Sequence, residues 1–193
     1  MDLTQGTDQE KNNRAKKMML WFGIISLTMS FAGLTSAVIV SSSRPDWLND
    51  FSLPQAFITS TILIVISSIT FLLAKRAIKN NKNAQATVLL WVTLLLGIVF
   101  IWSQLIGFKQ IIDLGYAFTG PTSNVTMSFV YIIAFVHILH VVVGLISILV
   151  VIYNHYKQKY SPSNLLGVEL STTYWHFVDF LWLFLFLFLN YIS

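Results

Sequence analysis

The chain has 193 residues, of which 55% are hydrophobic and only 10% are charged, with a formal net charge of +4. Soluble domains carry about 25% charged residues, so this composition excludes a soluble globular fold and predicts an integral membrane protein. The chain has no cysteine, which excludes disulfides, thiolate metal ligands and thiol nucleophiles.

Residues 1–17 are polar and precede an uncharged run over residues 18–43. This run is too long for the apolar core of a cleaved signal peptide, and no small-residue cleavage site follows it. We therefore predict a short, disordered cytoplasmic tail over residues 1–17 and a membrane domain over residues 18–193, with its first span at 18–43.

Four more spans are predicted from the positions of charged residues, at 51–74, 83–108, 124–153 and 170–193. A helix needs about 20 apolar residues to cross the hydrocarbon core, and each run provides that many. Backbone groups in lipid must pair within the segment, so the spans are expected to be helices. The predicted fold class is an all-α integral membrane protein, a bundle of five transmembrane helices with short connections.

Orientation is predicted from the basic residues. Ten of the 12 Lys and Arg residues lie in the tail, in the connection between the second and third spans, or in that between the fourth and fifth. Because positive charge stays on the cytoplasmic side, the N-terminus is expected in the cytoplasm and the C-terminus outside. The net charge then reflects the topology of a membrane protein, and we expect no nucleic-acid partner. The basic residues after the second span could also contact acidic lipid headgroups: Lys75, Arg76, Lys79 and Lys82.

The ionisable residues in or beside the last two spans are the candidate site. His137 and His140 are three residues apart, as are His176 and Asp179, and Glu169 precedes the fifth span. Ionisable groups inside spans are costly and face the bundle interior or a polar cavity. Three hypotheses stay open: a metal or haem site, a structural hydrogen-bond network between the two spans, and a relay or buffer for protons near the cytoplasmic surface. No catalytic constellation is complete.

The run 169–179 reads Glu-Leu-Ser-Thr-Thr-Tyr-Trp-His-Phe-Val-Asp and resembles the C-terminal signature of subunit III of haem–copper terminal oxidases. The pattern His137-x-x-His140-x-x-x-Gly144 resembles the motif of that family's penultimate helix. Five helices fit the family's short bacterial form. One departure is Leu27, which stands where the family usually has a carboxylate in its first conserved helix.

The resemblance implies a non-catalytic subunit of an aerobic respiratory oxidase in the bacterial cytoplasmic membrane. It implies that haem and copper belong to partner subunits, with no cofactor, metal or catalytic residue in this chain. The expected partners are subunit I in direct contact, subunit II and other subunits of the respiratory complex, and phospholipids held in a cleft between the first two helices and the remaining three.

The resemblance also implies support for proton uptake on the cytoplasmic side and protection of the active site during turnover. His176 and Asp179 would orient each other. The residues carried over to this role, as a proton buffer or a polar network between helices, are His137, His140, Glu169, His176 and Asp179.

Three alternatives remain. The oxidase could take electrons from quinol instead of cytochrome c. The chain could also be a free-standing b-type cytochrome that uses His137, His140 and His176, or a small transporter. The absence of an internal repeat in the sequence argues against the transporter.

Overall fold

The computed structural model describes the whole chain except residues 1–5, 49–52, 121–122, 162–163 and 193. It contains five long helices: α1 (Asp8–Ser41), α2 (Gln55–Lys79), α3 (Asn83–Asp113), α4 (Val125–Tyr156) and α5 (Leu166–Ile192). All five are long and apolar enough to cross a membrane, and the described residues form no β-strand, only isolated bridges. The predicted all-α membrane bundle is confirmed. The predicted start of the second span, residue 51, and the end of the fifth, residue 193, lie outside the described residues.

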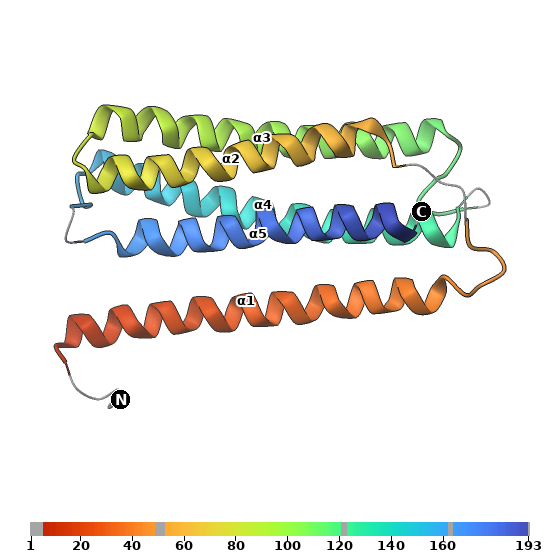
Figure 1. Cartoon of the computed structure of the whole chain (residues 1–193), viewed down its shortest axis with the longest axis horizontal. Helices are drawn as coiled ribbons and strands as arrows, with labels where there is room; N and C mark the ends of the chain where they lie inside the picture. The colour runs from red at the N-terminus through yellow and green to blue at the C-terminus, as the bar shows by residue number, and fades with distance from the viewer. Residues whose placement is uncertain (1–5, 49–52, 121–122, 162–163, 193) are drawn as a thin grey trace.

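The helices run alternately in opposite directions, because each connection is short (Figure 1). One end of the bundle carries the start of α1 and the α2–α3 and α4–α5 connections, and we call it the basic end. The opposite end carries the α1–α2 and α3–α4 connections and the C-terminus. Ten Lys and Arg residues belong to the segments of the basic end, as the charge pattern predicts.

Helices α2 to α5 form a closed four-helix bundle, and α1 lies beside it (Figure 1). Helix α2 packs on α3 and α5, and α4 packs on α3 and α5. Helix α1 packs on α4 and α5 but, within the described residues, on neither α2 nor α3. The expected grouping of the first two helices against the last three is therefore wrong for this chain, because the division falls between α1 and the other four.

Helix α1 begins ten residues before the first predicted span. Thr7 Oγ1 accepts from the backbone N–H of Glu10, and the Glu10 carboxylate accepts from the N–H of Thr7, which makes a complete capping box. This cap stabilises a first turn whose residues are polar. The disorder predicted for the tail is thus wrong for residues 8–17, which are helical.

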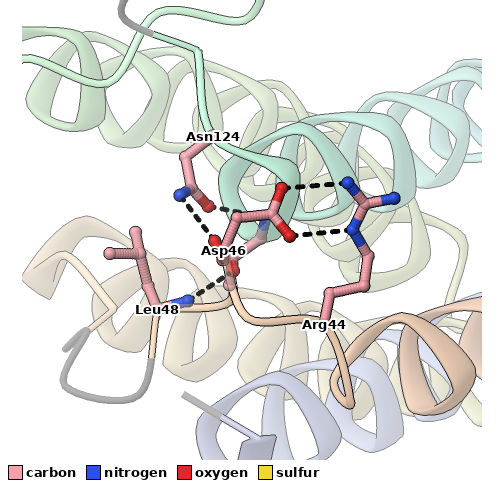
Figure 2. Close-up of polar contacts among 5 residues, drawn as sticks. Arg44, Asp46, Leu48 and Asn124 are labelled. Carbon is pink, nitrogen blue, oxygen red and sulfur yellow. Dashed lines mark hydrogen bonds and ion pairs between the residues drawn. The ribbon is translucent and has the colours of Figure 1, made fainter.

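The α1–α2 connection is anchored to the start of α4 (Figure 2). Arg44 donates two hydrogen bonds to the Asp46 carboxylate, at 2.8 and 3.0 Å, and holds the pKa of that carboxyl below its usual range. The Asp46 carbonyl accepts from Asn124 Nδ2 at 3.1 Å, and the Leu48 N–H donates to Thr126 Oγ1 at 3.0 Å. Asn124 also caps α4 by accepting from the Thr126 N–H at 2.8 Å.

The centre of the bundle is built around two tryptophans of α5. Trp175 and Trp182 are fully buried, and their spacing of seven residues places both on one face of the helix. A methyl group added at Gly97 or Gly144 would lie 2.8 or 2.7 Å from the Trp175 ring. These two glycines therefore let α3 and α4 approach the indole closely, as small residues do at membrane helix interfaces.

Candidate functional site

Three ionisable residues follow one face of α5 from the basic end inward. Glu169 lies in the first turn, with 38% of its side chain exposed, whereas Asp179 is only 5% exposed. His176 is half-buried between them. We call these three residues the α5 file. At 1.5 Å per residue, it extends about 15 Å along the helix from Glu169 to Asp179. It therefore begins at the surface and ends in the bundle interior.

The outer member of this file contacts α1. The Lys17 ammonium lies 3.1 Å from the Glu169 carboxylate, and both side chains are well exposed. Such an exposed pair adds little stability, because solvent screens it. The pair shows that Glu169 lies next to α1 at the basic end of the bundle.

The partner of His176 comes from α2. The Ser68 hydroxyl is hydrogen-bonded to His176 Nδ1. Neither carboxylate oxygen of Asp179 has a hydrogen-bond partner, although the Ser68 hydroxyl is close enough to interact with it. The direct His176–Asp179 contact expected from sequence is therefore not formed, because Ser68 takes the ring nitrogen instead.

The two histidines of α4 do not join this file. His137 is fully buried, its ring packs against Phe31, Phe100 and Trp182, and neither ring nitrogen has a hydrogen-bond partner. His140 Nδ1 donates to the carbonyl of Val136, one turn earlier, at 2.7 Å. The His137 ring is therefore surrounded by aromatic side chains, and His140 is hydrogen-bonded to the backbone of its own helix. Their proposed role in proton buffering or a polar network stays a prediction.

Helix α2 has a polar face that was not predicted from the sequence. Trp175 Nε1 donates to Ser67 Oγ at 3.2 Å, and Trp182 Nε1 donates to Thr61 Oγ1 at 3.1 Å. With Ser68, which is hydrogen-bonded to His176, these hydroxyls pair with three side chains of α5. The available signal was the spacing of the hydroxyls, because Thr61 and Ser68 are seven residues apart and so lie on one face of a helix. The polar network thus joins α2 to α5, as well as α4 to α5 through Ser147 and Ser171 at 2.8 Å.

The ionisable side chains of the described residues lie in separate surroundings. Across the described part of the chain, no group of three or more His, Asp or Glu residues is placed to hold a metal ion. His137 and His176 have separate surroundings, an aromatic cage and a serine on α2. Leu27 is buried in the apolar core. Glu169, His176 and Asp179 thus place two carboxyl groups and an imidazole along α5, and their role as a proton buffer or a polar network stays a prediction.

Comparison with known proteins gives one consistent result. The sequence model of the family described as "Cytochrome c oxidase subunit III" matches residues 18–193. Cytochrome c oxidase subunit 3 of Synechocystis sp. is 30% identical over 175 residues, covering 86% of this chain and 72% of that protein. Cytochrome bo(3) ubiquinol oxidase subunit 3 of Buchnera aphidicola is 32% identical over 174 residues, covering 87% of each. Cytochrome c oxidase subunit 3 of Spodoptera frugiperda is 32% identical over 140 residues, covering 72% of this chain and 88% of that one.

Proposed function

The chain belongs to the cytochrome c oxidase subunit III family, and we propose that it is the non-catalytic subunit III of a haem–copper terminal oxidase. The observation that carries this proposal is the family match over residues 18–193, which includes α2 to α5 and most of α1. Family membership also places the chain in an oxidase complex in a membrane. It favours a subunit over a free-standing b-type cytochrome or a small transporter.

The proposed partners supply the redox chemistry. A chain with four histidines and no cysteine has few ligands for haem and copper, and its described histidines do not converge on one point. We therefore assign both cofactors to the partner subunits, with subunit I in direct contact and subunit II nearby. The electron donor is cytochrome c or quinol, because the relatives are named as subunits of both kinds of oxidase.

The proposed orientation places the basic end in the cytoplasm of a bacterium, in its cytoplasmic membrane. The support is the charge bias, since Lys and Arg concentrate on the cytoplasmic side of membrane proteins. Glu169, at the basic end, would then face the compartment that supplies protons for oxygen reduction.

The proposed contribution to proton uptake rests on the α5 file. Glu169 is open to water, His176 is half-buried and has an imidazole that can accept a proton, and Asp179 is buried at the inner end. Within the described residues the file ends at Asp179, so it would buffer and deliver protons near one surface without crossing the bundle. The role in holding lipid and protecting the partner's active site is carried over from the family.

Co-purification tests the proposal. A tagged chain extracted in mild detergent should retain an oxidase whose haem bands appear in the visible spectrum of the eluate. The chain purified alone should be colourless. A tagged membrane protein of another family, treated identically, is the control. A Soret band from the isolated chain, or the absence of any oxidase in the eluate, would contradict the proposed function.

A further inference from the structure

Two adjoining pockets lie at the basic end, where α1, the end of α2 and the start of α5 converge. The outer pocket has a volume of about 440 Å³ and is lined by Lys17, Lys75, Lys79, Glu169 and Asn13, among others. The second, of about 360 Å³, shares Lys17, Lys75 and Glu169 with the first. The two therefore form one recess that continues from the outer pocket along α1 and α5.

The recess has an excess of positive charge. Lys17 is paired with the Glu169 carboxylate at 3.1 Å. Lys75 and Lys79 have no salt bridge to any carboxylate in the described part of the chain. The start of α5 also lines the outer pocket, and the N-terminus of a helix favours an anion. Two ammonium groups without a salt bridge in the described residues, beside a helix N-terminus, would favour the binding of a phosphate group.

The second pocket is different in chemistry from the first. Its lining includes Leu20, Trp21 and Leu170, which lie where the apolar parts of α1 and α5 begin. Trp21 is 58% exposed, and exposed tryptophans are typical of the membrane–water interface. An anion site that continues into an apolar, interfacial wall fits a lipid better than a free phosphate, because a lipid has a glycerol and acyl chains to fill it.

The recess also lies where the protein lacks contacts of its own. Helix α1 packs on α4 and α5 but not on α2 in the described residues, yet Lys17 of α1 and Lys75 of α2 line both pockets. We propose that an acidic phospholipid binds here, with its phosphate between Lys17, Lys75 and Lys79, and links α1 to α2. This inference deepens the lipid-binding part of the proposed function, since it names the lipid class and the place.

The test uses the full-length chain in mild detergent, with bound lipid measured by native mass spectrometry. Phosphatidylglycerol and phosphatidylcholine are added at equal concentration, and we expect selective retention of phosphatidylglycerol. Each lysine near a phosphate contributes about fivefold, so the K75Q/K79Q variant should lose about 25-fold in selectivity. K82Q is the matched control, because Lys82 lies three residues after Lys79 but does not line the recess, and it should behave as the unchanged chain.

A second variant separates charge from folding. K75R/K79R keeps both charges and should retain phosphatidylglycerol, whereas equal loss in the Arg and Gln variants would overturn the proposal. Equal retention of both lipids would also overturn it. Release of phosphatidylglycerol by millimolar inorganic phosphate would show a free-phosphate site instead. The K75Q/K79Q chain should still co-purify with the oxidase, so a failure of the lipid site is distinguishable from a failure of the proposed function.

Discussion

Asp179 combines two properties that rarely occur together in one carboxyl group. It is 5% exposed within a transmembrane helix, and both of its oxygens lack a hydrogen bond in the part of the chain that the structure describes. A buried polar group without a partner costs free energy, whereas an apolar group of similar size does not. Residues that cost stability are often retained for function, and the position of Asp179 at the inner end of the α5 file supports such a role.

Asp179→Leu should therefore stabilise the isolated chain, by about 1–3 kcal/mol of unfolding free energy, because it removes an unpartnered buried group. The same variant should reduce oxidase turnover at high pH if the file delivers protons. Unfolding in denaturing detergent measures the first effect, and oxygen consumption the second. Asp179→Asn, which keeps a polar group of the same shape, is the control and should gain little stability. A less stable Asp179→Leu chain would show that the carboxyl group has a partner after all.

Helix α5 packs along α1, α2 and α4, and its two buried tryptophans also reach α3. Its indole nitrogens are satisfied by hydroxyls of α2, and the Trp175 ring fills the space left by glycines on α3 and α4. The ring also lies one residue before His176, so its packing sets the position of the candidate site. Steric fit at this point should therefore affect both stability and function.

Gly144→Ala should destabilise the chain by about 1–3 kcal/mol, since the new methyl group would lie 2.7 Å from the rigid Trp175 ring. Gly33→Ala is the matched control on α1, where a methyl group would meet nothing within 4 Å. It should leave the stability unchanged or slightly higher, because alanine favours a helix over glycine. Thermal unfolding in detergent compares the two. Equal melting temperatures would mean that Trp175 moves aside at no cost.

At the scale of the whole molecule, the alternating helices place ten basic residues in the segments of one end. This asymmetry predicts the orientation. A reporter active only in the cytoplasm should work when inserted in the α2–α3 connection near Lys79 and should fail when fused after the last residue. Activity in both fusions, or in the second alone, would contradict the orientation on which the proton proposal depends.

Deletion of the chain tests its contribution to the complex. The haem spectrum of the remaining oxidase should be nearly unchanged, because this chain supplies no ligand in the proposed function. Turnover should start more slowly, with a deficit that grows at high pH, where protons are scarce and a surface buffer matters most. Activity should then decline over successive turnovers. Oxygen consumption over time at two pH values, with and without the chain, is the measurement, and identical rates and lifetimes would contradict the role.

The membrane spans could be predicted from the sequence because crossing a bilayer is a local property. Each span is a run of about 20 apolar residues bounded by charge, and such runs are visible without knowledge of any contact. The start of α1 could also have been predicted, since Thr7 and Glu10 form a capping-box pattern in the sequence. The polar composition of residues 1–17 predicts a disordered tail, whereas the capping-box pattern of Thr7 and Glu10 predicts the start of a helix, and the structure follows the capping box.

The five helices, their alternation, the charge asymmetry and, through the C-terminal signature, the family can all be predicted without any knowledge of contacts. Which residues meet depends on how the helices pack. His176 bonds to Ser68, 108 residues away, and Glu169 pairs with Lys17, while His176 and Asp179, three residues apart on one helix, make no direct bond. The physical reason is that spacing along a helix places residues on a face, whereas the partner of that face depends on how the helices pack around it.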